Sequence, residues 1–373
     1  MSELKRTILY QAHLDAGATM VDFGGWDMPI QYPEGIIAEH LYCRRHCGIF
    51  DVSHMGEVIV TGPDATEFVN YIFTNDVSKA ADGQCLYGMM LHEDGGVVDD
   101  LLVYRFNENK YLLVINAANI AKDEEWIQSH LSDRRPDGKG FFHVDLELIS
   151  EVTSELAIQG PEAEKVVEEV LGIQCADLKF YTFKETTFEG KPVLISRTGY
   201  TGEDGFEVYA TDAEIEAMWD KLMASGRCAP CGLGCRDTLR FEVGLPLYGD
   251  ELADDITPVE AGLSMFVKLD KPYFIGREAI AKQKAEGPKR RIVGLELTDR
   301  AVPRHGYEVL DADGNVVGAV TTGYHGLSVD KSIAMAMVDA RCAAMDTPLQ
   351  VRIRRKTFPC RVVRKQFYKK SYK

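Results

Sequence analysis

Residues 93–106 read EDGGVVDDLLVYRF, a tight turn followed by an apolar strand that two aspartates interrupt. The paired glycines tolerate the positive φ of a tight hairpin, and the valines and leucines favour an extended chain. Side chains alternate along a strand, so Asp100 shares a face with Tyr104 while Asp99 takes the opposite face. One aspartate must therefore point inward, where an ionised carboxylate is costly unless it is paired or used. Either the face that carries Asp100 is exposed to solvent, or its acid has a chemical role.

The length of 373 residues predicts two or three packed domains, because single cores stop growing below this size. No stretch reaches the ~20 apolar residues of a membrane span, so no membrane role is expected. The N-terminus, MSELKRTILYQAH, resembles neither a secretory signal nor a transit peptide. A cytoplasmic protein, or an already processed chain, is expected. Nine cysteines in such a chain favour reduced thiols over a disulfide framework.

The charge is strongly acidic and unevenly spread. A net charge of −16 disfavours a nucleic-acid role, because such binding depends on Lys and Arg neutralising phosphates. Residues 352–373 hold ten Lys and Arg and no acid, leaving 32 basic against 58 acidic residues, or −26, in the rest. This basic tail is either a contact for an acidic partner or polyanionic ligand, or a solvated strand pair and terminus.

Helical and extended patterns alternate up to about residue 285 in an order typical of an α+β fold. Strands are expected at 111–115, 154–159 and 193–197, and Asp64 and Asp212 are plausible caps of the helices that follow them. The helix after Asp64 should bury one apolar face, formed by Ala65, Phe68, Val69 and Ile72. The other helical patterns cover residues 4–17, 35–47, 118–131 and 162–171.

The pattern changes after residue 289 to short strands separated by turn dipeptides such as Asp313-Gly314. This spacing suggests a small barrel or sandwich. We therefore predict two regions, residues 1–285 and a C-terminal β-domain at 286–373.

Cysteine and histidine spacing raises the possibility of a metal. Cys228, Cys231 and Cys235 are three and four residues apart, but only one CxxC pair exists, whereas zinc sites generally use two. Reduced cysteines at small-residue positions are the preferred interpretation, and no metal is expected. No cysteine has the setting of a catalytic nucleophile.

Two further motifs carry charge beside glycines. TGYTGEDG (198–205) lacks the features of a phosphate-binding loop, but Glu203 could accept two hydrogen bonds from an amidine-like edge such as a pterin ring. A solvent-facing turn is the alternative. In GLGCRDTLRFEVG (232–244), Arg236 and Arg240 lie one helical turn apart, where they would pair with a carboxylate of the protein or of a ligand.

Six motifs taken in order along the chain resemble the glycine cleavage system T protein family, the aminomethyltransferases. They are FDVSHMGEVIVTGPDA, GGVVDDLLVY, RTGYTGEDGFEVY, GLGCRDTLRFEVGLPLYGDEL, TPVEAGLSMFVKLDK and FIGREAI. The resemblance covers nearly the whole chain. It departs at VTTGYHGLSVDKSIAMAMV (320–338), a barrel segment in which the family usually has a Ser-Gly-x-x-Ser-Pro pattern.

The resemblance implies a cloverleaf of two interleaved α+β subdomains and a C-terminal β-barrel around a channel for tetrahydrofolate. It also implies the reaction. An aminomethyl group carried on the lipoyl arm of the H protein would give up its methylene to tetrahydrofolate, with release of ammonia and formation of 5,10-methylenetetrahydrofolate.

Carried over residue by residue, the resemblance makes Asp100 the catalytic acid. Its family positions for folate contact match Met55, Tyr87, Tyr104, Asn116, Glu203, Arg236 and Tyr372.

Two other interpretations stay open at the level of sequence. One is another folate-dependent enzyme of the same superfamily that demethylates an amine or a sulfonium. The other is a non-catalytic folate-binding protein, against which the aspartate at position 100 counts.

Overall fold

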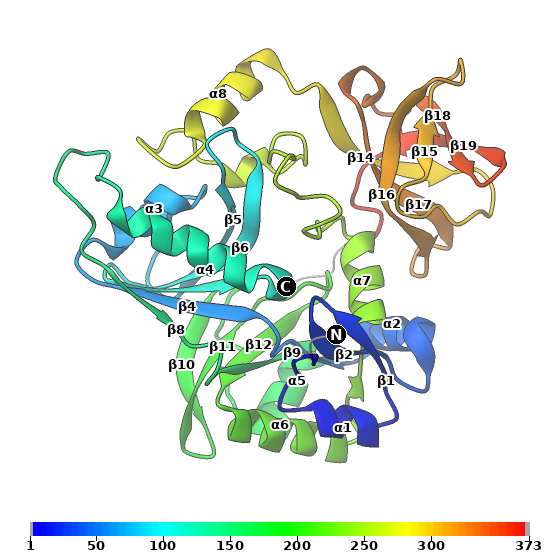
Figure 1. The fold of residues 1–373 in the computed structure, drawn as a ribbon. Coiled ribbons are helices and arrows are strands. Elements are labelled where there is room, and N and C mark those ends of the chain that lie inside the picture. The colour runs from blue at the N-terminus through cyan, green and yellow to red at the C-terminus, as the bar shows by residue number, and fades with distance from the viewer. Residues whose placement is uncertain (1–2, 370–373) are drawn as a thin grey trace.

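The computed structural model describes residues 3–369, which form two lobes built on β-sheets and a barrel (Figure 1). The first sheet has five strands in the order β5-β6-β7-β4-β8. The turn at 92–96 connects β5 and β6, which pair antiparallel as predicted, with Met89 opposite Asp100. The strands are β4 (Gly56–Thr61), β5 (Gln84–Leu91), β6 (Val97–Asn107), β7 (Lys110–Ile115) and β8 (Asp145–Leu148).

Helices α3 (Ala65–Ile72) and α4 (Ile120–Ser129) pack against one face of this sheet. The four apolar residues predicted to face the core from α3 are all buried. The predicted cap is wrong, because Asp64 makes no side-chain bond to the start of α3. Its carboxylate instead contacts Arg135 and accepts the backbone N–H of His143 at 2.9 Å. A guanidinium is a stronger partner than a helix amide.

The second sheet has six strands in the order β10-β11-β12-β9-β3-β13. Strand β3 precedes the whole first sheet in sequence, whereas the other five strands follow it, so the two subdomains are interleaved. The strands are β3 (Gly48–Asp51), β9 (Ser154–Gln159), β10 (Phe183–Phe188), β11 (Lys191–Ser196), β12 (Gly205–Ala210) and β13 (Ala229–Pro230).

Helices cover the second sheet, and α7 lies between this lobe and the barrel (Figure 1). The helix predicted at 4–17 is confined to α1, because Lys5 is extended and exchanges backbone hydrogen bonds with the β1-β2 hairpin. None of the helices in residues 3–369 has the length and apolar character to cross a membrane. The elements are α1 (Tyr10–Asp15), β1 (Thr19–Phe23), β2 (Trp26–Gln31), α2 (Gly35–Arg45), α5 (Ala163–Val166), continued by a π-helix at Val167–Leu171, α6 (Asp212–Ala224) and α7 (Leu233–Glu242).

The C-terminal strands close into a barrel in the order β14-β17-β16-β15-β18-β19, so of the two predicted β architectures the barrel is confirmed. Gly314, with φ of +84°, forms the predicted turn between β15 and β16. Helix α8 (Arg277–Glu286) precedes the barrel, whose strands are β14 (Arg290–Leu297), β15 (Glu308–Leu310), β16 (Val316–Gly326), β17 (Lys331–Asp339), β18 (Pro348–Ile353) and β19 (Lys356–Val363).

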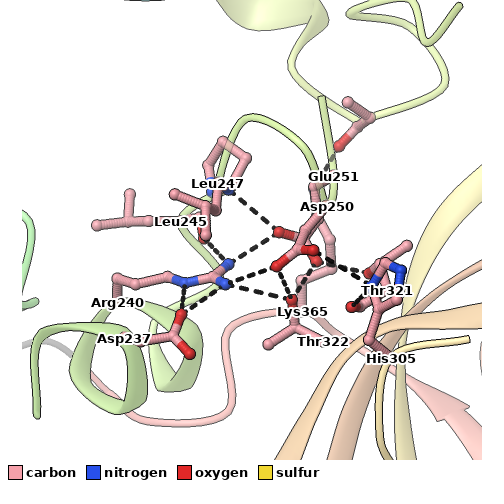
Figure 2. A network of polar contacts seen from close by, with 12 residues as sticks. Asp237, Arg240, Leu245, Leu247, Asp250, Glu251, His305, Thr321, Thr322 and Lys365 are labelled. Atoms are coloured by element: carbon pink, nitrogen blue, oxygen red, sulfur yellow. Dashed lines mark hydrogen bonds and ion pairs between the residues drawn. The ribbon is translucent and has the colours of Figure 1, made fainter. Parts of the chain in front are cut away.

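A buried network joins α7 to the barrel (Figure 2). The guanidinium of Arg240 has no exposed surface and donates to Asp237 at 2.7 Å, to Glu251 at 2.8 Å and to Thr322 at 3.2 Å. Thr321 and Thr322 of β16 donate in turn to Glu251, at 2.5 and 2.7 Å. The second arginine of the 232–244 motif is therefore a link between lobes, which fixes α7 against β16.

Candidate active site

Asp99 and Asp100 point to opposite sides of β6, as the pleat predicts. On the Asp100 side, Tyr104 packs in a cluster with Tyr209 of β12, so this face is turned toward the second sheet. On the other side, Asp99 is buried and accepts a hydrogen bond from Asn119, next to α4, at 2.7 Å. The essential acid predicted from the sequence thus lies between the two sheets.

Asn116 and Tyr87 fix the carboxylate of Asp100. The side-chain amide of Asn116, which follows β7, donates to Oδ1 of both Asp99 and Asp100, at 2.9 and 3.0 Å. Its backbone N–H donates to Oδ2 of Asp99 at 3.0 Å. The hydroxyl of Tyr87 donates to Oδ2 of Asp100 at 2.7 Å. The structure therefore brings three of the predicted site residues together.

The surroundings of Asp100 oppose its ionisation. Burial, and then the negative charge of Asp99, raise the pKa of Asp100 to about 7. Burial and the charge of Asp100 also raise the pKa of Tyr87 well above its usual value. Both side chains nevertheless retain some accessible surface. A carboxyl group that titrates near neutrality can take up or release a proton under ordinary conditions.

Two other residues predicted to contact folate, Tyr104 and Met55, lie nearby and differ in their burial and contacts. Tyr104 has no exposed surface, and its hydroxyl is within 2.9 Å of that of Tyr209 and 3.2 Å of that of Ser196. Its hydroxyl is therefore used in contacts between the two sheets, which no pattern in the sequence indicates. Met55, on the loop between β3 and β4, is half-buried and packs against the same aromatic cluster.

Glu203 is already paired within the protein. Its Oε1 accepts Nη1 of Arg44 at 3.0 Å, and its carboxylate also hydrogen-bonds the side chain of Tyr368. Only 4% of Glu203 is exposed. The expectation that this carboxylate is free for an amidine-like ligand therefore does not match the structure, because an arginine of α2, remote in sequence, takes that place.

Arg236 lies over the ring of Tyr200, with 4.7 Å between the guanidinium carbon and the ring centroid. Both residues line a cavity of about 530 Å³ between α7, α2, the β1-β2 hairpin and the barrel. Burial raises the pKa of the Tyr200 hydroxyl; the positive charges of Arg240 and Arg236 oppose this rise and the negative charge of Asp100 adds to it. The cavity is mainly apolar, and its other lining residues include Phe23, Ile30, Ile36, Leu233, Leu247, Val302 and Leu327.

Two acidic residues of the second sheet were missed in the sequence. Glu207 of β12 shares a face with Tyr209, and Glu155 of β9 lies on the same side of the sheet, toward Asp100. Thr198 donates to Oε2 of Glu207 at 2.5 Å, while Oε2 of Glu155 has no hydrogen-bond partner among the described residues. Burial is the main reason that the pKa values of both acids are raised. Glu207 could have been identified from the sequence, because it is an acidic residue within the otherwise apolar strand FEVYA (206–210).

The remaining predictions concern the tail and metals. Tyr372 lies outside the described residues. The carboxylate of Glu39 lies near Cys231 and Cys235, but its two oxygens accept backbone N–H groups of Tyr32 and Gly232, at 2.6 and 2.8 Å. Burial also raises the pKa of the Cys235 thiol. This arrangement does not present a set of free, ionised ligands.

Comparisons with known proteins agree along the chain. The family model described as the GCVT N-terminal domain matches residues 9–271, and the glycine cleavage T-protein C-terminal barrel domain matches residues 290–369. A protein of Alkaliphilus oremlandii named aminomethyltransferase is 48% identical, with both chains fully covered. One of the same name from Caldanaerobacter subterraneus is 47% identical, covering 100% of this chain and 98% of the relative.

A solved structure has the same fold. The glycine cleavage system aminomethyltransferase T from Bartonella henselae superposes with a TM-score of 0.92 at 35% identity, covering 99% of each chain. The fold and the matches define the class of an α+β transferase with a C-terminal barrel. The chain belongs to the glycine cleavage T-protein family, as the motifs of the sequence indicated.

Proposed function

We propose that this protein is the aminomethyltransferase of a glycine cleavage system. It would transfer the methylene of an aminomethyl group, held on the lipoyl arm of the H protein, to tetrahydrofolate. Ammonia, 5,10-methylenetetrahydrofolate and the dihydrolipoyl carrier would be the products. The observation that carries the proposal is the carboxylate of Asp100, fixed by Tyr87 and Asn116 on the face between the two sheets.

Asp100 supplies what this transfer needs from the protein. The methylene loses its C–S bond to the lipoyl thiolate and its C–N bond to the departing ammonia while it forms two C–N bonds to folate. This path passes through positively charged nitrogen and carbon, and the attacking folate nitrogens must lose protons, which the leaving ammonia and thiolate can take up. A carboxylate held in a water-poor setting stabilises such charge more than water does, and it can accept a proton. The hydrogen bonds from Tyr87 and Asn116 keep both oxygens in place without reorganisation.

The residues between the sheets fit the folate ring. An aminopyrimidinone edge presents adjacent N–H donors, which a carboxylate can accept as a pair. Glu207 and Glu155 lie on that face, and of the two only Glu207 keeps accessible surface, whereas Glu155 is buried. We therefore assign ring recognition to Glu207, with Met55, Tyr87 and Arg236 as further contacts. We assign Glu203 a structural role, as the buried ion-pair partner of Arg44.

The cavity lined by Arg236 and Tyr200 is suited to the carrier arm, because it is apolar and these two residues connect it to the surroundings of Asp100. The basic end of the chain would meet either the H protein or the glutamate tail of folate. No metal is assigned to this reaction, and we expect it in the cytoplasm.

The test is to incubate the purified protein with tetrahydrofolate and aminomethyl-loaded H protein while following ammonia and methylene-folate. Stoichiometric formation of both products is expected. A parallel incubation with simple methylated amines in place of the H protein tests the demethylase alternative. Products from the amines alone, or from neither donor, would overturn the proposal.

A further inference from the structure

Asp123, in the first turn of α4, is a buried acid that the proposed mechanism does not use. It has no exposed surface, and neither of its oxygens accepts a hydrogen bond from an N–H or O–H group of residues 3–369. Its carboxyl group faces that of Asp99, and the two can form a hydrogen bond only when one of them carries a proton. Two carboxyl groups in such contact share a proton, because like charges at this distance cannot both ionise in a buried site.

The surroundings decide which of the two acids carries the proton. Asp99 accepts three N–H donors, two from Asn116 and one from Asn119. Asp123 accepts none. The ammonium group of the adjacent Lys122 is turned away and donates to the Val98 carbonyl at 2.5 Å and to the hydroxyl of Tyr248 at 2.8 Å. The ionised form is therefore stabilised at Asp99 and the neutral form at Asp123.

We propose that Asp123 is a positioning residue whose carboxyl group stays protonated and donates its proton to Asp99, which in turn holds the Asn116 amide on Asp100. The inference rests on the proposed function, since it concerns the setting of the same acid. The proton of Asp123 gives Asp99 a fourth hydrogen-bond donor. Because Asp123 is then neutral, Asp99 is the one negatively charged member of this pair next to Asp100.

Burial, followed by the contact with Asp99, raises the pKa of Asp123 strongly, in agreement with a neutral acid. The groups that face Asp123 are Asp99, Asp100, Lys122 and Tyr248. Those that face Asp100 from the surrounding elements are Asp99, Tyr87, Asn116 and Tyr200. Lys122 is the cation among the groups that face Asp123, and its ammonium group donates to other partners. The contact with the Asp99 carboxyl group is therefore the polar interaction available to Asp123.

Substitution by asparagine tests the protonation state directly. An amide keeps a donor for Asp99 and cannot ionise, so Asp123→Asn should leave the midpoint of the pH profile of kcat unchanged within about 0.3 of a pH unit. If Asp123 were ionised in the native protein, the substitution would remove a negative charge near Asp100. The midpoint would then move to lower pH by about one unit or more, which would overturn the proposal.

Asp123→Ala removes the donor as well as the carboxyl group. It should lower kcat by about tenfold while the KM for tetrahydrofolate changes by less than about twofold, and the asparagine variant should recover most of that loss. Equal losses in the two variants would contradict a donor role. If both variants and the native protein lack activity, the proposed function fails and this inference is judged by spectroscopy instead.

Infrared difference spectra give a readout that needs no turnover. At pH 8, the spectrum of the native protein minus that of Asp123→Asn should contain the C=O band of a protonated carboxyl group. If the alanine variant does not fold, this comparison still decides the protonation state. A difference spectrum with only carboxylate bands would show that Asp123 is ionised and would overturn the proposal.

Discussion

The hydroxyl of Tyr87 donates a hydrogen bond of 2.7 Å to Oδ2 of Asp100 across a diagonal of the β5-β6 ladder. Tyr87 is opposite Leu102 and Asp100 is opposite Met89, so the two side chains lie on the same face two positions apart. With Oδ1 held by Asn116, neither oxygen of the carboxylate can rotate away. The strand register thus sets the direction in which this acid acts.

Asp100→Asn should abolish most of the activity, because it keeps the shape of the side chain and removes its charge. We expect turnover to fall by about a hundredfold or more, with tetrahydrofolate affinity within about threefold of the native value. Steady-state kinetics and calorimetric titration measure the two quantities. Tyr87→Phe is the control, because it removes only a neutral hydrogen-bond donor to Asp100. It should lower turnover by less than Asp100→Asn does. Native turnover in the asparagine variant would exclude Asp100 as the catalytic acid.

The rate should rise with pH around neutrality. Since the pKa of Asp100 is raised to about 7, the carboxylate is the minor form below that pH and the major form above it. A role as anion and base therefore predicts a kcat that increases through about pH 7 and levels off above it. A profile measured from pH 5.5 to 8.5 with saturating substrates checks this. A rate that falls over the same range would assign the working form to the neutral acid.

Glu207 and Glu203 should differ in what they support. Glu207→Gln is expected to weaken tetrahydrofolate binding by about 1.5–3 kcal/mol, the range for a hydrogen bond to a charged group. Glu203→Gln should instead lower the free energy of unfolding by about 3 kcal/mol, because it leaves Arg44 without one buried partner. Binding and urea denaturation, measured on both variants, separate the roles. The reverse pattern would return ring recognition to Glu203.

Arg240→Met should destabilise the protein strongly. The substitution leaves Glu251, of which 1% is exposed, without its cation, and breaking such a buried pair costs about 3–5 kcal/mol. Arg341→Met is the matched control, since its side chain is 67% exposed and its ion pairs lie on the surface. Such pairs contribute about 0–1 kcal/mol. Scanning calorimetry of the two variants should show a large and a negligible shift in melting temperature, and similar shifts would contradict the assignment.

Binding of the carrier should weaken as salt increases. If the basic residues after position 351 bind the H protein, they attract it through interactions that ions screen over about 10 Å at 0.1 M. The Kd of the H protein, measured by titration at increasing sodium chloride, is therefore expected to rise while that of tetrahydrofolate monoglutamate changes little. If the Kd of the H protein does not depend on salt, the basic tail does not contribute to binding it.

Much of the site could be predicted because it depends on local geometry. Alternation along 93–106 separated Asp99 from Asp100, and the strand ending at Ile115 placed Asn116 at the end of the neighbouring strand of the same sheet. Glu207 could have been found in the same way, as a charged residue between Phe206 and Val208 in an apolar strand.

The contacts that the sequence did not indicate join residues that are distant along the chain. Glu203 is paired with Arg44, 159 residues away, and Tyr104 meets Tyr209 across two sheets, 105 residues apart. Asp64 caps no helix because Arg135 lies beside it in the folded chain. No pattern in a single sequence shows which charged side chains will meet, since that depends on how whole elements pack.

The interleaving of the two sheets has a consequence for synthesis on the ribosome. Strand β3 ends at Asp51, but its neighbour β9 begins at Ser154, after the strands of the first sheet have been made. At about 5–20 residues per second, roughly 100 residues of delay leave β3 unpaired for on the order of 5–20 s. The first lobe can fold as it emerges, whereas the second lobe must wait for later strands. The nascent chain therefore exposes an apolar edge during elongation, which gives chaperones a defined period in which to bind it.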